Sequence, residues 1–368
     1  MLRGYLETWR AIFADRAALL MLIGSVILYS VLYPSAYSRQ VVQHVPVVIV
    51  DLDHSPFSRS LAGKIAAVRA VRVVGGAVDL VEAREAISSG RADAIVLIPG
   101  GAQRSLSQGA PAPVILYANG AYLNRATGAL SGLGDATAAV ARDAAGEQAR
   151  FRGAPAPPPL TLSMRPLFNI REGYGSAVVP GVSELIIQQT MMMGIIVLAA
   201  SRREAVGRLR FRPAILLAIW AAFVSLGLVT LTYFIGLIYW AQDYPRGGNP
   251  LGLLLGVPLF VGAVAAFALW LASFFKTRER PLQLLVSTSL PIFFLSGLSW
   301  PREVTPEPLN ALAALLPTTA GVTMMVKFNQ MGASLREAAP EMLNLAGLLL
   351  LYGGLAVWRY WPDRADRT

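Results

Sequence analysis

The chain has 368 residues, of which 55% are hydrophobic, only 15% are charged and none is cysteine. This composition excludes an ordinary soluble domain, in which about a quarter of the residues are charged, and the mean hydropathy of +0.52 points the same way. The lack of cysteine excludes disulfides, thiol catalysis and cysteine-ligated metals. We attribute the net charge of +10 to basic loops beside a membrane rather than to nucleic-acid binding.

The first 16 residues predict an amphipathic helix that lies in the cytoplasmic interface of a membrane. Apolar side chains recur at helical spacing from Leu2 to Phe13, whereas Arg3, Glu7 and Arg10 occupy the opposite face. Residues 17–37 are apolar and long enough to cross a bilayer. No clear cleavage site follows, so we interpret them as an uncleaved first span rather than a secretory signal.

Residues 38–175 predict an α/β domain between the first two spans. Segments 46–53, 71–76, 92–101 and 112–120 are rich in apolar and β-branched residues, which is typical of strands, and helical segments such as 78–88 separate several of them. This alternation predicts a largely parallel sheet. Residues 121–152 predict one long helix, and the proline-rich run 154–159 predicts a stiff linker.

Asp51 and Asp53, at the end of the first strand, are the candidates for catalytic chemistry. Paired carboxylates with His54 nearby suit a Mg²⁺ site, so a membrane-bound phosphohydrolase is one interpretation. We favour the other, a turn in which Asp and Ser side chains cap the next helix, with Ser55 as its N-cap. His44 and His54 match no zinc spacing. No P-loop sequence that could bind ATP occurs in the chain.

Five further apolar stretches, within residues 176–361, predict six spans in all. They are residues 176–200, 213–240, 251–275, 281–300 and 343–361. Segment 312–325 is short and contains Pro317, so it suits a re-entrant or outer segment within residues 301–340. The termini and connections on one side hold 14 Lys and Arg, and the short segments on the other side hold 4. The positive-inside rule therefore predicts that both termini, including the tail 362–368, are cytoplasmic.

Polar residues in the second span are candidates for a substrate path. Glu184, Gln188 and Gln189 lie toward its outer end, and Met192 follows one turn deeper. An ionisable group within a span is a functional candidate by default. The alternative is structural, with Glu184 at headgroup level, the glutamines joining helices by hydrogen bonds and Met192 filling space.

Three segments carry family motifs: DLDHSPFSRSL (51–61), RPLFNIREGYGSAVVPGV (165–182) and LSGLSWPREVTPEPLNALAALLPTTAGV (295–322). The last is the most specific, because SG, WP and a later LP-T stand at fixed offsets. Its matching residues are Ser296, Gly297, Trp300, Pro301, Pro317 and Thr318. Together the segments resemble the type-2 ABC exporter permease family, in its long form with an extracytoplasmic domain between the first two spans. The likeness is closest to multidrug-efflux permeases of Gram-negative bacteria.

The resemblance implies a permease that dimerises, with a second copy or a related permease, and binds ABC nucleotide-binding ATPase subunits in the cytoplasm. The cytoplasmic loop 201–212 is the expected coupling surface. Its candidate residues are Arg202, Arg203, Glu204, Gly207 and Arg208. Two features depart from the family pattern: the second acid and the Thr of its R-E-x-E-x-G-T run are absent, and Asn169-Ile170 replaces an N-P pair. A periplasmic adaptor protein is a further candidate partner.

We therefore expect a transport subunit of an ATP-driven exporter in a bacterial inner membrane, rather than an enzyme. Its fold would be a polytopic α-helical membrane protein with six transmembrane helices and an inserted α/β domain. The substrate would be a hydrophobic or amphipathic drug, lipid or glycan. No cofactor or metal is expected in this chain, since a partner subunit would bind ATP. The phosphohydrolase using Asp51 and Asp53, and a non-transporting sensor or scaffold, are the alternatives.

Overall fold

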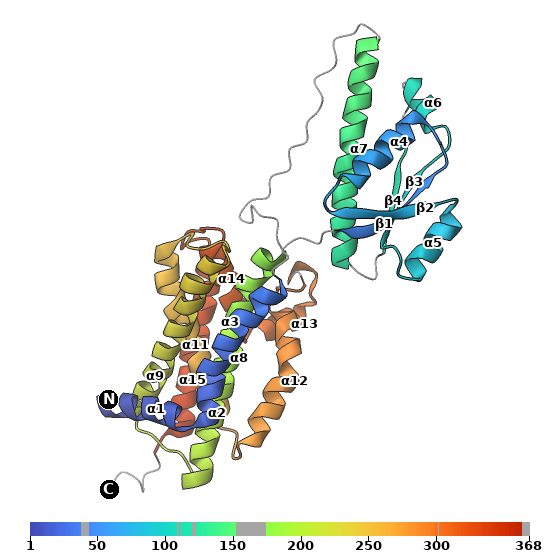
Figure 1. Ribbon diagram of the computed structural model, residues 1–368. Coiled ribbons are helices and arrows are strands. Elements are labelled where there is room, and N and C mark those ends of the chain that lie inside the picture. Colours follow the sequence, from blue (N-terminus) through green and yellow to red (C-terminus); the bar gives the residue numbers. More distant parts are fainter. Residues whose placement is uncertain are drawn as a thin grey trace. The chain divides into compact units, whose positions relative to one another are not determined.

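The computed structural model describes residues 1–37, 44–108, 110, 112–119, 123–151, 174–300 and 302–362. The chain divides into two compact units, Met1–Ser38 with Pro166–Thr368, and Arg39–Arg165. We call the first the membrane unit and the second the inserted unit (Figure 1). The predicted linker 154–159 and the pair Asn169-Ile170 lie outside the described residues.

The membrane unit is built from helices joined by short connections. At its start, the amphipathic helix α1 packs against α9, and the Tyr5 hydroxyl donates to Ser225 Oγ at 2.9 Å. The helices are α1 (Leu2–Ala14), α2 (Arg16–Leu19), the π-helix η1 (Leu20–Gly24), α3 (Ser25–Ala36), α8 (Tyr174–Val206), α9 (Pro213–Thr232), the π-helix η2 (Tyr233–Ile238), α10 (Tyr239–Ala241), α11 (Pro250–Ala272), α12 (Glu279–Leu295), the 3₁₀-helix η3 (Arg302–Val304), α13 (Glu307–Ala314), α14 (Pro317–Asn329) and α15 (Ala339–Tyr360).

Five helical stretches of the described chain are long and apolar enough to cross a membrane. They are Arg16–Ala36, Gly175–Val206, Pro213–Ala241, Pro250–Ala272 and Ala339–Tyr360. The sixth predicted span, 281–300, corresponds to α12, which has only 17 residues and ends at Leu295. At 1.5 Å per residue α12 is about 25 Å long, whereas the hydrocarbon core is roughly 30 Å thick. A sixth full-length span therefore stays a prediction.

The short apolar segment with Pro317 is bent rather than straight. Pro317 is the first residue of α14, where its missing N–H costs no helical hydrogen bond. The axes of α13 and α14 meet at 83°. The segment is therefore a broken pair of helices, in agreement with the predicted interruption.

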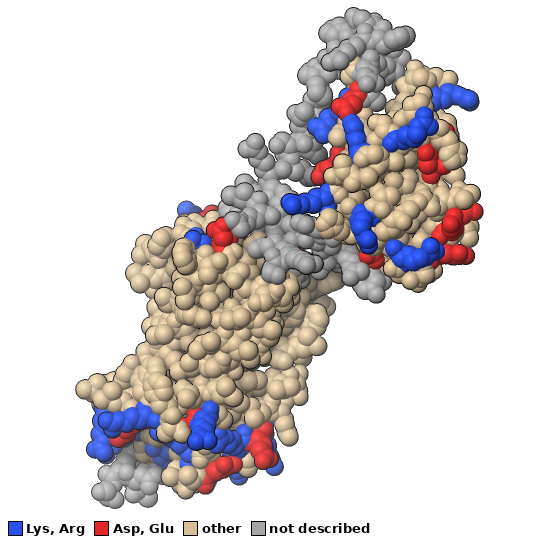
Figure 2. All heavy atoms as spheres, viewed as in Figure 1, with Lys and Arg blue, Asp and Glu red and all other residues tan. Residues whose placement is uncertain are grey.

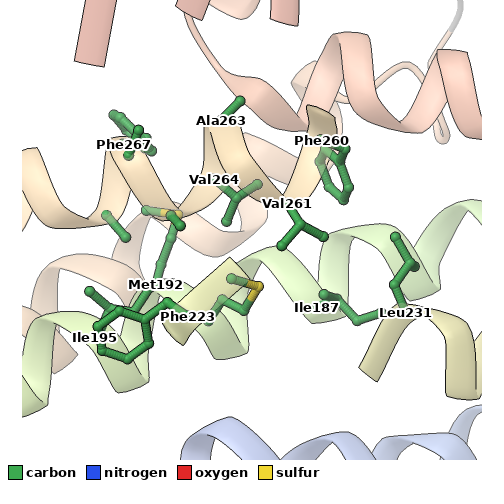
Figure 3. Close-up of a cluster of buried hydrophobic side chains, with 14 of the residues drawn as sticks. Ile187, Met192, Ile195, Phe223, Leu231, Phe260, Val261, Ala263, Val264 and Phe267 are labelled. Carbon is green, nitrogen blue, oxygen red and sulfur yellow. The ribbon is translucent and has the colours of Figure 1, made fainter. Parts of the chain in front are cut away.

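The core of the membrane unit lies where α8, α9 and α11 meet. Figure 3 shows Met192 of α8 among apolar side chains that include Phe223 of α9 and Val264 of α11. The side chain of Val261 in α11 packs directly on Gly227 of α9, because a Cβ added at Gly227 would lie 2.4 Å from a methyl group of Val261. This close contact leaves no room for a larger residue at position 227.

The inserted unit contains a four-stranded sheet with the order β2-β1-β3-β4. β1 (Val45–Asp51) pairs in parallel with β2 (Val71–Ala77) and with β3 (Ala94–Ile98), whereas β4 (Ile115–Ala118) pairs antiparallel with β3. The expected α/β region is therefore present. Its sheet is parallel in three strands and antiparallel in the fourth, which agrees with the predicted, largely parallel sheet.

Helices cover both faces of this sheet. On one face, Val47 clusters with Leu61 of α4 and Leu133 of α7. On the other face, Val50 clusters with Ala83 of α5. Because β1 is buried on both faces, its sequence is a continuous apolar run rather than an alternating one. The helices of the unit are α4 (Pro56–Ala66), α5 (Leu80–Ser88), α6 (Ala102–Ser107) and α7 (Leu123–Phe151), the last being the predicted long helix.

Candidate functional site

Asp51 closes the turn between β1 and α4. One of its carboxylate oxygens accepts the backbone N–H groups of Asp53 (3.0 Å) and His54 (2.9 Å), and the other accepts the hydroxyl of Ser58 (2.7 Å). Burial alone would raise the pKa of Asp51. The hydrogen bonds, led by that from Ser58, outweigh burial and lower the pKa below its ordinary value.

The carboxylate of Asp53 also accepts hydrogen bonds, from the N-cap residue of α4 and from the start of α6. Its oxygens accept the Ser55 hydroxyl and the backbone N–H groups of Gly101 (2.7 Å) and Gln103 (3.1 Å). The bond from Ser55 is the main reason that the pKa of Asp53 is lowered. Ser55 also caps α4, as predicted. Because the oxygens of Asp51 and Asp53 accept hydrogen bonds within the turn, the structure favours the turn over the phosphohydrolase.

A second group of polar side chains lies inside the membrane unit, along α8. Glu184 is 2% exposed and Gln188 is fully buried. The Gln188 amide donates to the hydroxyl of Thr318 in α14. The Ser183 hydroxyl shares a hydrogen bond with the hydroxyl of Tyr239, which also donates to a main-chain carbonyl of α8 at 2.9 Å. The buried polar side chains of α8 therefore connect it to the ends of two neighbouring helices.

Several buried atoms of this group have no hydrogen-bond partner among the described residues. They are Oε2 of Glu184, Oε1 of Gln188, and both Nε2 and Oε1 of Gln189. Most buried polar atoms in proteins do have a partner, so these atoms are free to meet a polar group that the chain itself does not supply. Met192, by contrast, is 1% exposed and packs in the apolar core.

The first half of the 295–322 motif ends α12. The Ser296 hydroxyl donates to the carbonyl of Phe293 at 2.6 Å, and Gly297 has φ of 83°. Glycine is favoured at such a left-handed position just beyond a helix end. Trp300 is 57% exposed, as expected for an interfacial aromatic residue, and Pro301 lies outside the described residues.

The second half of the motif connects the start of α14 by hydrogen bonds to α8 and to the end of α12. Pro317 starts α14, and buried Thr318 accepts the hydrogen bond from Gln188. The neighbouring hydroxyl of Thr319 donates to the carbonyl of Leu295, near the end of α12, at 3.1 Å. The motif thus works as a connection that holds the polar part of α8 against the end of α12.

The segment 201–212 is helical in its first half, because α8 continues to Val206. Gly207, with φ of 80°, follows the end of the helix. Arg208 is exposed and Arg202 is half-buried. Figure 2 shows Lys and Arg side chains gathered at this end of the membrane unit, beyond a band with few charges.

Arg203 binds within the protein instead of facing outward. Its guanidinium donates to three carbonyl oxygens at the C-terminal end of α11, with distances of 3.0 Å to those of Ala272 and Ser273. These carbonyls have no partner inside the helix, and a cation is favoured at this end of the helix dipole. Arg359 of α15 also donates to Ser273. Arg203 therefore joins α8 to the end of α11.

Glu204 joins α8 to the start of α12. Its Oε1 accepts the backbone N–H of Arg278 at 2.8 Å, and Arg278 is the N-cap residue of α12. The Arg278 guanidinium in turn contacts Oδ1 of Asp15 at 2.7 Å, and Asp15 caps α2. A chain of contacts therefore connects the first span, α8 and α12.

Sequence reasoning missed Asp15 and Arg278 as parts of this surface. They are 263 positions apart, and no local pattern relates them. The one available signal was that both stand immediately beside predicted spans, on the side rich in basic residues. Of the predicted residues, Glu204 contacts Arg278 directly, whereas Arg203 binds the end of α11 and Arg208 is exposed.

Comparison with known proteins adds an independent observation. Residues 16–358 match the family model described as ABC-2 family transporter protein. The chain is 23% identical over 360 residues to the inner membrane transport permease YhhJ of Escherichia coli K12, with 95% of this chain and 94% of the relative covered. The protein of the same name from Shigella flexneri matches equally.

Proposed function

The chain belongs to the ABC-2 family of transporter proteins, and on that premise we propose that it is the membrane subunit of an ATP-driven exporter. It is a multi-pass inner-membrane protein and a transport subunit rather than an enzyme. Beyond family and location, we propose that transport is outward and that a separate subunit hydrolyses ATP. We also propose that two permeases form a dimer and that both termini are cytoplasmic.

The observation that carries the proposal is that one unbroken helix, α8, reaches from the basic end of the membrane unit to the buried polar group. About 24 Å of helix separates Glu204 from Gln188. Because a helix is stiff along its axis, a displacement imposed near Glu204 would be transmitted to Gln188. This is the mechanical link that an ATP-driven permease needs.

The helix α12 is connected to the same elements at both of its ends. Glu204 meets its first turn through Arg278, and Thr319 of α14 meets its last turn. α8, α12 and α14 would therefore move as a set. A rearrangement of this set could expose the buried acceptors of Glu184 and Gln188 alternately to the two sides.

The unpartnered acceptors indicate which part of a substrate would bind. An amphipathic molecule that donates hydrogen bonds would satisfy Oε2 of Glu184 and Oε1 of Gln188, while its apolar part would lie against the surrounding apolar side chains. Drugs, lipids and glycans all contain such donors, so the class remains a hydrophobic or amphipathic molecule.

The surface for the ATPase subunit would be the exposed part of the segment 201–212. Val206 is 68% exposed, and Arg208 is also exposed, so an acidic partner surface with an apolar pocket would fit both. Arg203 and Glu204 would act indirectly, by fixing the end of α8 to α11 and α12. The alternative for Arg208 is contact with anionic lipid headgroups.

The experiment is ATP-driven export by the purified complex in proteoliposomes, with Glu184→Gln, Gln188→Leu and the control Met192→Leu. Glu184→Gln replaces one of the two carboxyl oxygens by an amide NH2 group, and Gln188→Leu removes the acceptor oxygen. Each should lower export by about tenfold, since a substrate donor would lose its partner. Met192→Leu conserves volume in the apolar core and should leave export unchanged. Equal export by all three variants would contradict the proposed path.

A further inference from the structure

A polar cleft of about 510 Å³ lies at the end of the membrane unit away from Arg203, where α13, α14 and α15 meet. Its volume is within the range of ordinary ligand sites. The lining residues are Arg302, Glu303, Asn310, Thr323, Lys327 and Glu341. Two cations and two anions therefore face one space, and none of them belongs to the proposed path along α8.

Lys327 and Glu341 form the inner wall of the cleft. The Lys327 ammonium lies 2.7 Å from Oε1 of Glu341 and donates to the carbonyl of Glu337 at 3.0 Å. Oε2 of Glu341 is buried without a hydrogen-bond partner among the described residues. One helical turn along α15, Oδ1 of Asn344 is in the same condition. Glu341, which lines the cleft, therefore carries one buried and unused acceptor beside a cation.

Arg302 supplies the second cation from η3. Its side chain is half-buried, and no ion pair joins it to another of the described residues. The amide of Asn310 donates to the main-chain carbonyls of Arg302 and Thr305, at 3.0 Å each, so the backbone that carries Arg302 is fixed against α13. A guanidinium held in this way is suited to a phosphate group.

From this arrangement we infer that the cleft binds the headgroup of a phospholipid that carries a primary amine. The phosphate would lie against Arg302 and Lys327, and the ammonium would donate to the unused oxygen of Glu341. An anionic headgroup without an amine, such as that of phosphatidylglycerol, offers only uncharged hydroxyl donors, which bind a carboxylate less strongly than an ammonium does. A quaternary ammonium headgroup has no N–H and would leave the Glu341 oxygen unpaired.

A membrane lipid fits the surroundings better than a soluble ligand. The helices that supply Asn310 and Glu341 also expose leucines, Leu312 at 52% and Leu343 at 72%. In a membrane-spanning protein such side chains contact acyl chains. A polar cleft beside lipid-facing helices receives a headgroup whose tails stay in the bilayer.

The test is native mass spectrometry of the purified full chain with added phosphatidylethanolamine, phosphatidylcholine or phosphatidylglycerol of identical acyl chains. Phosphatidylethanolamine should be retained about fivefold or more over the others, as expected when only one of the headgroups brings a charged N–H donor to a buried acceptor. Glu341→Gln should abolish this preference. Arg302→Gln should weaken the binding of all three. The exposed controls Glu307→Gln and Arg336→Gln should change neither property.

Several results would overturn the inference. Equal retention of phosphatidylethanolamine and phosphatidylcholine by the wild type would remove the role of the amine. A Glu341→Gln chain that loses thermal stability but keeps the wild-type preference would make the Lys327–Glu341 pair purely structural. Because Arg302 forms no ion pair with the described residues, Arg302→Gln tests the site without breaking an ion pair that stabilises the fold. Displacement of the lipid by equimolar soluble phosphoethanolamine would point to a soluble ligand instead.

Discussion

Replacing Arg203 by methionine should weaken the membrane unit far more than the same change at Arg208. Both residues belong to the segment 201–212, but Arg203 binds the carbonyl oxygens at the end of α11, whereas Arg208 is exposed. Methionine keeps most of the apolar stem and removes the charge and the donors. The pair of variants therefore separates an internal anchor from a free basic residue.

The expected cost follows from the geometry. A hydrogen bond that involves a charged group contributes about 1.5–3 kcal/mol. One guanidinium nitrogen serves all three carbonyls, so the three contacts count as one or two bonds. The favourable charge at a helix C-terminus adds about 0.3–1 kcal/mol, and Arg359 still donates to Ser273 in the variant. We expect Arg203→Met to lower the free energy of unfolding by about 2–4 kcal/mol.

Tryptophan fluorescence during thermal or denaturant unfolding in detergent is the suitable assay. All 7 tryptophans lie within the membrane unit, so the signal reports that unit alone. Arg203→Met should lower the midpoint by on the order of 5–10 °C, and Arg208→Met should remain within about 0.5 kcal/mol of the wild type. Equal stability of the two variants would refute the anchoring of α8 by Arg203.

Three further predictions concern packing, pH and orientation. Gly227→Val should cost about 1–3 kcal/mol by overpacking against Val261, measured by the same unfolding assay, and an unchanged midpoint would contradict the direct packing of Val261 on Gly227. The pKa of Asp53 lies below its ordinary value of 3.8, so its contribution to stability is complete above pH 3.8 and is lost as the pH falls through the lower folded value. Hydrogen exchange of the turn should therefore quicken on acidification relative to α5, and Asp53→Asn should remove that dependence. Because the chain has no cysteine, single cysteines report orientation: an impermeant thiol reagent on spheroplasts should label Gln242→Cys and spare Arg208→Cys, and the reverse pattern would contradict cytoplasmic termini.

The elements that sequence predicted well are those set by local chemistry. Apolar runs of about 20 residues indicated the long spans, Ser55 before Pro56 indicated the start of α4, and Pro317 indicated the break between α13 and α14. The buried strand β1 was visible because both of its faces are covered, which makes the whole run apolar.

The parts that sequence reasoning left open depend on contacts between distant segments. The apolar run up to Trp300 predicts a full span, and this stays a prediction because α12 ends at Leu295 and a turn follows at Gly297. A largely parallel sheet was predicted, but no periodicity in residues 112–120 reveals that β4 runs antiparallel to β3. The carbonyls that Arg203 binds, 69 to 72 positions away, leave no mark in its own neighbourhood.

We expect this chain to work with a separate ATP-hydrolysing subunit, so the subunit composition of the complex in its native membrane is the decisive measurement. The full chain, tagged and purified in mild detergent from its own membrane, should carry a P-loop ATPase in equal amount, and the complex should hydrolyse ATP. Arg208→Glu should release that subunit, because it reverses the exposed charge of the proposed docking surface, while tryptophan fluorescence shows an intact membrane unit. A folded wild-type chain that purifies with no ATP-hydrolysing subunit would contradict the account.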